Sequence, residues 1–463
     1  MGWKDLVGKF RKKPIKPKER IIDPWATQLS GVDESSQRQK LIIGLDFGTA
    51  FTKVVVGEQR VHFPIPFQIG QQPSSCYLPC LFYLSPHGEC SLESQQSWKR
   101  ITNLKIALLD KACNEEKKKQ IIAFLALVLR HVRMWLFQNK ASIYANKYID
   151  WHLNIGLPTD DYHDTKFETF YRELVQAAWL ASVCEGAVSI GLAARCLDEI
   201  QQAKGHSSPH ALPISSIDPI HPEKIGCFPE FVAQVAGYVR SPFRRDDLHM
   251  LVDVGAGTLD VTVFNVHEHD GEDVFPIFAK AVRPLGSAYL LRHRMNRLGR
   301  KNDEFDPISP VPPDEDFAKA YGLTLERVAD IDEGFRKEVR ILVAGELKQV
   351  KLHRHCKSIH WETGVPSFLC GGGSNVPLYR EVLRVLERPD YPFRIRLGVL
   401  PYPENLDGDC AKKTEYYRML VAYGLSFDAF DLGKIIKYQN IKDDKGLQKK
   451  EDIEDRFVSK DMV

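Results

Sequence analysis

Two short segments of the sequence each place an aspartate at the end of an apolar run and follow it with small residues and a threonine. These segments are Asp46-Phe47-Gly48-Thr49-Ala50 and Asp253-Val254-Gly255-Ala256-Gly257-Thr258. Small residues let a ligand approach the backbone closely, and such turns present consecutive N–H groups to a phosphate. Two turns of this kind, facing each other, would clamp a polyphosphate, with the hydroxyls of Thr49 and Thr258 as further donors.

The acids in these turns are unsuited to holding phosphate directly, because like charges repel. They suit a hydrated Mg²⁺ that bridges the phosphates, since this ion keeps several waters and accepts carboxylates. We therefore expect Asp46 and Asp253 to hold Mg²⁺ through water, and Lys53 to neutralise a phosphate oxygen. A single turn of this type is common in ordinary hairpins, so the prediction depends on the pair.

A third segment, Phe368–Pro377, runs from apolar residues through three glycines into the helical pattern YREVLRVLE. Because glycines let a flat ring approach the backbone, we expect Gly372, Gly373 and Ser374 to border such a ring. The alternative is a flexible joint between a strand and a helix.

The elements that must position these residues follow an α/β pattern. Residues 41–58 and 250–266 each predict a strand, a turn of small residues and a second strand, which indicates two related halves. Trp151–Leu157 predicts a buried strand. Helical periodicity predicts helices over Glu115–Lys140, Lys166–Leu197, Glu326–His353 and Lys412–Leu425.

In this order, the three segments resemble the first phosphate, second phosphate and adenosine motifs of the actin, heat-shock chaperone and sugar kinase ATPase superfamily. The resemblance spans Leu41 to Phe430. It implies a two-lobed actin-like ATPase fold, made of duplicated ribonuclease H-like domains, with an ATP cleft between the lobes. It also implies that the chain binds ATP or ADP together with Mg²⁺.

Further segments are similar to the heat shock protein 70 branch. Gly226–Tyr238 resembles a connecting segment whose acid, here Glu230, orients a water near the γ-phosphate; the alternative is a helix N-terminal acid favoured by the helix dipole. Arg283–Leu290 resembles the loop that follows a Gly-Gly phosphate contact, with Gly286 kept and a serine in the other place. Tyr416–Phe427 is similar to a helix that ends in Ala-Tyr-Gly and returns to the first lobe, and Lys105 is the best counterpart of the branch's essential lysine.

Three features depart from that branch. Ala256 replaces the middle glycine of the second phosphate turn, and Lys53 is more like actin and the bacterial actin-like proteins. After Leu425 only a short charged tail follows, so we expect no conventional peptide-binding half.

The function expected from the resemblance is an ATP-binding, slowly hydrolysing, chaperone-like switch that acts on a protein partner. A nucleotide-dependent actin-like filament is the first alternative. A small-molecule kinase and an ATP-binding pseudoenzyme without turnover are the others.

The expected organisation has five parts. They are a flexible basic arm (1–40), lobe I (41–248) with an insertion at about 201–222, lobe II (249–410), a helix returning to lobe I (411–430) and a charged tail (431–463).

The 463 residues are 43% hydrophobic, enough for two sizeable cores. The 63 basic and 61 acidic residues nearly cancel, so the overall charge favours no polyanionic partner, although the arm is basic enough to contact nucleic acid. The longest apolar run, Ile121–Leu129, is shorter than the roughly 20 residues that cross a bilayer, and the N-terminus lacks the apolar stretch of a secretion signal. We expect no membrane span and a cytoplasmic location.

Cysteine usage favours buried, reduced thiols, because the ten cysteines form no CxxC pair. His353, His355 and Cys356 could contribute to a zinc site, but no second ligand pair lies at the necessary spacing. We favour a polar helix end there.

Overall fold

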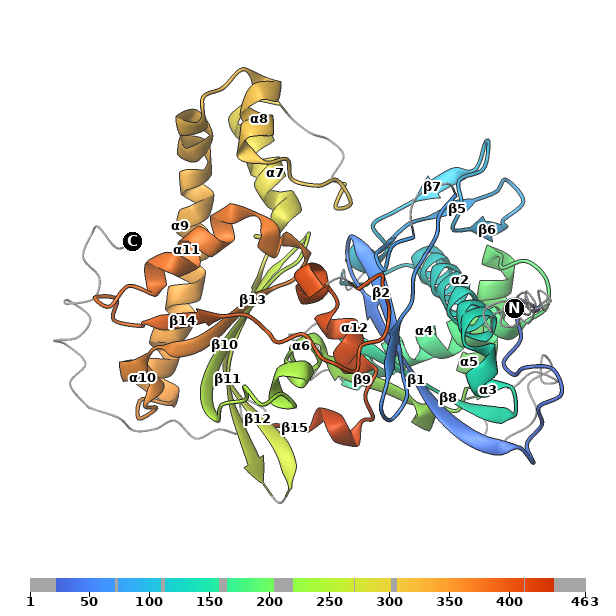
Figure 1. The fold of residues 1–463 in the computed structure, drawn as a ribbon. Coiled ribbons are helices and arrows are strands. Elements are labelled where there is room, and N and C mark those ends of the chain that lie inside the picture. The colour runs from blue at the N-terminus through green and yellow to red at the C-terminus, as the bar shows by residue number, and fades with distance from the viewer. Residues whose placement is uncertain are drawn as a thin grey trace, which may run out of the picture.

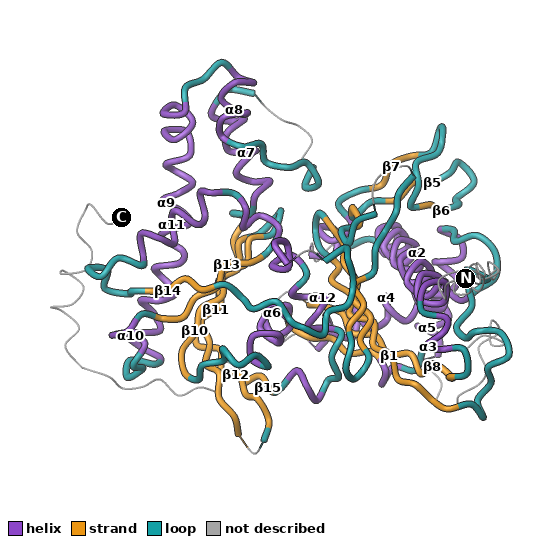
Figure 2. The backbone as a smooth tube through the Cα atoms, in the orientation of Figure 1, coloured by secondary structure: helices purple, strands orange, loops and turns teal. Residues whose placement is uncertain are grey.

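A computed structural model describes residues 22–70, 74–109, 113–157, 165–203, 220–269, 271–300, 306–411 and 413–436. In these residues helices alternate with strands of two six-stranded sheets, and a three-stranded sheet lies at one side (Figures 1 and 2). The α/β class predicted from the sequence is therefore confirmed.

The first sheet has the strand order β3-β2-β1-β8-β9, with β4 paired to β2. Its strands are β1 (Gln37–Phe47), β2 (Phe51–Gly57), β3 (His62–Pro64), β4 (Leu78–Pro79), β8 (Lys147–Leu157) and β9 (Ile225–Pro229). The three-stranded sheet contains β5 (Phe82–Leu84), β6 (Cys90–Ser91) and β7 (Lys99–Ile101). The helices of this half are α1 (Leu104–Leu109), α2 (Glu115–Asn139), α3 (Ala141–Tyr144), α4 (Thr165–Val183) and α5 (Ile190–Ala203).

The second sheet has the order β14-β13-β10-β11-β12-β15. Its strands are β10 (Asp247–Val254), β11 (Leu259–His269), β12 (Glu272–Arg283), β13 (Val365–Cys370), β14 (Ile395–Gly398) and β15 (Lys434–Ile436). The helices of this half are α7 (Ser287–Arg297), α8 (Asp314–Tyr321), α9 (Leu325–Gln349), α10 (His360–Thr363) and α11 (Pro377–Leu386).

The two sheets share one connectivity. In each, a first strand pairs antiparallel with a second, the second pairs antiparallel with a third, and the first also pairs parallel with a fourth, which pairs parallel with a fifth. This repetition agrees with the two similar hairpins in the sequence.

Alternation along the strands gives each sheet two different faces. Leu41, Ile43 and Leu45 of β1 pack in one core with α2 and α4. The opposite face of β1 packs against α12 (Leu420–Leu425). The two elements are so close that a Cβ on Gly44 would collide with the backbone of that helix.

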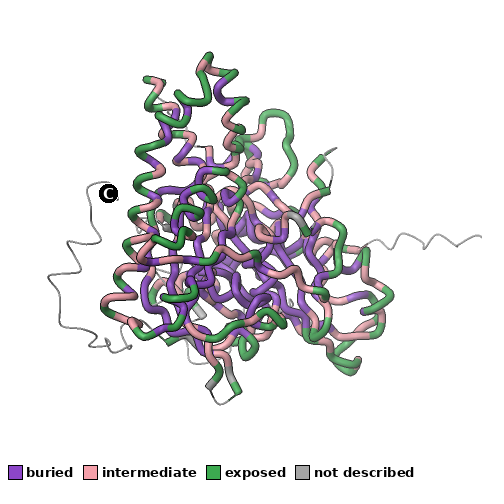
Figure 3. Tube along the Cα trace, turned by 60° about the vertical axis from the view of Figure 1, so that its left-hand side comes forward, coloured by how far each residue is buried: buried purple, intermediate pink, exposed green. Residues whose placement is uncertain are grey.

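The second sheet divides its residues in the same way. Met250 and Val252 belong to a core with α9 and α11, whereas Leu251 packs with α6 (Glu230–Val239) and α12. The two short helices α6 and α12 therefore form the layer between the sheets. Figure 3 shows buried residues gathered through this middle of the molecule and exposed residues along its projecting end.

Helix α2 is long and apolar enough to cross a membrane by length and composition. However, 78% of its apolar window is buried inside the protein, as is expected of a core helix.

Two predicted boundaries are wrong. The arm predicted to reach Lys40 is too long, since Leu29 is buried in the first core and the Gln28 amide bonds the backbone of Ile149. The tail predicted from residue 431 includes β15, which pairs with β12. The rest of the predicted arm (1–21), most of the insertion (204–219) and the rest of the tail (437–463) lie outside the described residues.

The predicted helix Lys166–Leu197 is in fact two helices, α4 and α5. Gly186, with a φ of 89°, lies between them, and the Ser189 hydroxyl accepts from the Leu192 N–H at the start of α5. A left-handed glycine therefore lies in the turn between the helices, and a serine cap begins the second helix.

The expectation of reduced cysteines fails at one pair. Cys76 and Cys410 form a disulfide across a sequence separation of 334 residues. It joins the approach to β4 in the first half to the segment between β14 and β15 of the second sheet. A pairing at this separation has no signature in local spacing.

Candidate functional site

A pocket of about 830 Å³ opens between turns of the two sheets. Most of the residues expected from the sequence to bind a ligand line it. They are Asp46, Gly48, Thr49, Ala50, Lys53, Lys105, Glu230, Asp253, Gly255, Ala256, Thr258, Gly372 and Gly373.

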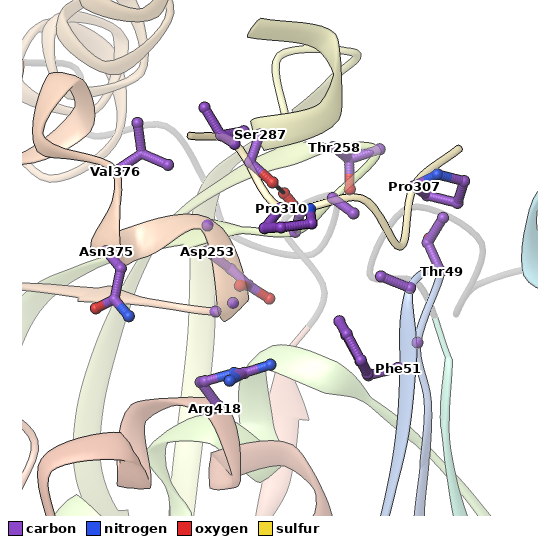
Figure 4. A pocket seen from close by; sticks show the side chains of 18 of the residues that line it. Thr49, Phe51, Asp253, Thr258, Ser287, Pro307, Pro310, Asn375, Val376 and Arg418 are labelled. Atoms are coloured by element: carbon purple, nitrogen blue, oxygen red, sulfur yellow. Dashed lines mark hydrogen bonds between the residues drawn. The ribbon is translucent and has the colours of Figure 1, made fainter. Parts of the chain in front are cut away.

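The two aspartate-bearing hairpins meet at this pocket. The β1–β2 turn is tight, because a Cβ on Gly48 would collide with the Phe51 carbonyl. The β10–β11 turn is closed by a Gly255 N–H bond to the Thr258 carbonyl at 2.9 Å. A Cβ on Gly257 would lie 3.7 Å from the Thr49 methyl carbon, so the turns face each other, as Thr49 and Thr258 do in Figure 4.

The start of α7 supports the second turn from behind. The Ser287 and Ala288 N–H groups donate to the carbonyls of Gly255 and Ala256, each at 3.0 Å. Gly286 packs directly on this turn, where a Cβ would collide with Ala256. Gly286 was predicted to bind the ligand, but it lies behind the turn, and Ser287 lines the pocket instead.

Two lysines in the pocket pair with carboxylates. Lys53 Nζ donates to Asp46 Oδ2 at 2.7 Å, and Lys105 Nζ donates to Glu230 Oε1 at 2.5 Å. Burial alone would lower the pKa of Lys105, but the Glu230 carboxylate beside it holds that pKa above its ordinary value. Lys105 therefore stays charged and fixes the Glu230 side chain.

Two other acids of the pocket, Asp253 and Asp260, are buried near further carboxylates. Burial and the nearby Glu230 carboxylate raise the pKa of Asp253 to about 6, against a hydrogen bond from Gln234 that lowers it. Burial and the Asp253 carboxylate likewise raise the pKa of Asp260 well above its ordinary value. One buried oxygen of Asp260 has no hydrogen-bond partner.

This donor set fits a hydrated Mg²⁺. Asp46, Glu230, Asp253 and Asp260 bring four carboxylates to one pocket, and all of their donors are oxygens, which a hard cation prefers. Burial and the neighbouring carboxylates raise the pKa of Asp253, and one buried Asp260 oxygen has no hydrogen-bond partner, so a cation beside these acids would be favourable.

The glycine-rich segment forms one wall of the pocket. Gly371 has a φ of 83° and lies directly over Asp253, so that a Cβ there would collide with the Asp253 carboxylate. Ser374 was expected to border the ligand, but it is buried, and its hydroxyl donates to the Gly371 carbonyl at 2.7 Å. It shapes the loop, and Asn375 lines the pocket instead.

Several lining residues have no place in the sequence prediction. Gln234 lies one turn after Glu230 on α6, and Asp260 lies two residues after Thr258 on β11, so helical and strand periodicity could have indicated both. Phe51, Arg418 and residues 307–313 also line the pocket, and no local pattern indicates them.

The sequence offered His353, His355 and Cys356 as part of a zinc site. His355 Nε2 instead contacts Asp247 Oδ1 at 2.7 Å. Among the described residues, no group of three or more histidines, cysteines or acids is placed to hold a metal ion. The water-mediated Mg²⁺ site at Asp46 and Asp253 stays a prediction from the sequence.

No family model matches the sequence, and no curated protein matches it. Among solved structures, one similar chain is described as "pCBH ParM non-polymerisable quadruple mutant". It shares 14% sequence identity at a TM-score of 0.41, and the match covers 83% of this chain and 98% of that one. A TM-score at this level establishes neither a shared fold nor a shared activity, so the geometry of the pocket must support any function.

Proposed function

We propose that this chain binds ATP with Mg²⁺ in the pocket between its two sheets and hydrolyses it slowly, as an actin-like, two-lobed nucleotide switch. The main support for this proposal is that the two aspartate-bearing turns and the Lys105–Glu230 pair line one pocket. Facing turns offer backbone donors to a phosphate chain from two sides.

Each polar group has a separate role in this proposal. Asp46 and Asp253 hold Mg²⁺ through water, and this ion supplies charge stabilisation to the phosphate oxygens. Glu230 orients a water and accepts its proton, while Lys105 holds the Glu230 carboxylate in place. Gln234 holds the Asp253 side chain through its hydrogen bond.

A ligand in this pocket would contact residues of both halves, so its phosphate state would bias their relative arrangement. We propose that a protein partner reads that arrangement, in the manner of a chaperone-like switch. The contact of α6 and α12 between the sheets supports this idea, because it is where the halves meet.

The test measures ATP binding and ADP release for the full chain with and without Mg²⁺. Glu230→Gln should lower turnover by about 10²–10⁴-fold while nucleotide affinity stays within a few-fold, because a general base acts in the chemical step. Asp253→Ala should remove the Mg²⁺-dependent part of the affinity. Glu333→Gln, an exposed change on α9, is the control, and unchanged binding and turnover in the first two variants would contradict the proposal.

Two further measurements separate the switch from its alternatives. Light scattering with ATP should stay flat as protein concentration rises, whereas a concentration-dependent increase would favour a filament. ADP release stimulated by a small-molecule acceptor would favour a kinase.

A further inference from the structure

The basic side chains that line the pocket differ in whether they form an ion pair with an acid. Lys53, Lys105 and Arg418 are the basic residues among its described lining. Lys53 and Lys105 each pair with a carboxylate. Arg418 forms no ion pair with a described carboxylate, although seven acids line the same pocket, namely Asp46, Glu230, Asp253, Asp260, Asp314, Glu315 and Glu381.

Aromatic rings, and not acids, hold this guanidinium. Arg418 Cζ lies 3.7 Å from the Tyr77 ring centroid and 5.4 Å from that of Phe51. Its buried Nε has no hydrogen-bond partner. Stacking on a ring fixes the plane of a guanidinium and leaves its N–H edges for an acceptor, so a strong donor set is oriented but unused in the described residues.

Backbone contacts place Arg418 beside the glycine-rich wall. The carbonyl of the preceding Tyr417 accepts from the Gly371 N–H at 3.3 Å, and a Cβ on Gly372 would lie 4.0 Å from Arg418 Nε. The Tyr77 hydroxyl donates to the Glu415 carbonyl at 3.2 Å, which ties the ring to the same segment. Figure 4 shows Arg418 reaching across the pocket toward Phe51, below Asp253.

We propose that Arg418 binds the phosphate chain of the nucleotide and makes the pocket selective for nucleotides over nucleosides. This inference rests on the proposed function. A planar guanidinium presents two parallel N–H donors that match two phosphate oxygens. Lys53 and Lys105 are engaged with acids, so among the described lining residues Arg418 is the cation that can meet a phosphate without first breaking an ion pair.

Calorimetric titration of the full chain with ADP, ATP and adenosine tests this inference. Arg418→Gln should weaken ADP and ATP binding by about 10–100-fold, the range expected for a charged hydrogen bond, and leave adenosine binding within about twofold. Arg418→Lys keeps the charge but loses the planar fork, so it should give an intermediate loss. Arg327→Gln, an exposed change on α9, is the matched control.

The outcomes are distinguishable. Equal ADP affinity in the wild type and Arg418→Gln overturns the inference, as does an equal loss for adenosine and ADP, which would place the guanidinium against the base or ribose. If Arg418→Gln does not fold, Arg418→Lys decides by the same comparison. Failure of the wild-type chain to bind any of the three ligands would instead contradict the proposed function.

Discussion

Asp253 is a carboxylate that the fold holds against its preference for water. Burial contributes most and the Glu230 and Asp46 carboxylates add to it, while Gln234 and Lys53 offset only part, so the pKa of Asp253 rises to about 6. The ionised form is therefore disfavoured in the folded chain. This cost is absent below about pH 4, where the carboxyl is protonated in both states, and complete above about pH 6.

Asp253→Asn should accordingly stabilise the ligand-free protein. Near pH 7 the free energy of unfolding should rise by about 1–3 kcal/mol. A pKa raised from 3.8 to about 6 corresponds to about 3 kcal/mol, and partial exposure of the side chain to solvent lowers this value. Near pH 4.5 the difference should shrink. Denaturant unfolding at both pH values measures it, with exposed Asp330→Asn as the control, and an unstabilised variant at neutral pH would contradict the assignment of strain to this carboxylate.

Part of the pocket lining can be predicted from the types and spacing of residues in the sequence. Asp46, Asp253 and Lys53 follow from local hairpin pattern, because a two-strand register fixes which residues meet at a turn. Lys105 and Glu230 were identified by resemblance, and the structure places them in contact. No local pattern indicates Arg418, because its stacking partner Tyr77 lies far away in the chain.

At the scale of elements, α12 is held by contacts that leave no room for a side chain. Gly424 packs on the Ala233 carbonyl of α6, and Gly44 of β1 packs on the Ala422 carbonyl of α12. The Asn154 amide of β8 donates to the Leu425 carbonyl at 2.8 Å, at the helix end. A six-residue helix would be marginal alone, so these close backbone contacts fix its position.

Gly424→Ala should therefore lower the free energy of unfolding by about 1–3 kcal/mol or more, because the added methyl meets backbone that must shift. Gly345→Ala is the matched control. Gly345 lies inside α9, where an added methyl group would meet no atom within 4 Å, and that change should stabilise by about 0.4–1 kcal/mol. Thermal unfolding compares the two, and equal effects of the same sign would contradict the packing argument.

Element prediction was most successful where periodicity is long. The predicted helix Glu115–Lys140 corresponds to α2, and Trp151–Leu157 lies within β8. The predicted helix over residues 412–425 is instead a 3-10 turn (Lys413–Arg418) followed by α12. Apolar periodicity does not distinguish a continuous helix from two short ones, which tertiary contacts decide.

At the scale of the whole molecule, each of the two duplicated sheets builds one half, and the disulfide is a covalent link between the halves. The sheet repeat could be predicted from two similar hairpins, whereas the Cys76–Cys410 bond could not, because its partners are 334 residues apart. The bond lies next to Tyr77, whose ring holds Arg418, so the cross-link and the pocket share one neighbourhood.

Cys410→Ser should lower the free energy of unfolding by about 2–5 kcal/mol, as loss of a cross-link that closes a long loop does. Dithiothreitol should have a similar effect on the wild type and none on the variant, which serves as its own control. Denaturant titration with and without the reductant measures both. A wild-type chain insensitive to full reduction would contradict a stabilising role for the bond.

The position of this disulfide also determines which segments of the chain would be extended by a mechanical force applied to its two ends. The chain between Cys76 and Cys410 contains both sheets except the first three strands of one and the last strand of the other. A pull on the chain ends would pass through the sulfur atoms and bypass everything between them. While the bond is intact, this pull could not extend the chain from Cys76 to Cys410, α9 included, whereas β1, β2, β3, α12 and β15 would bear it.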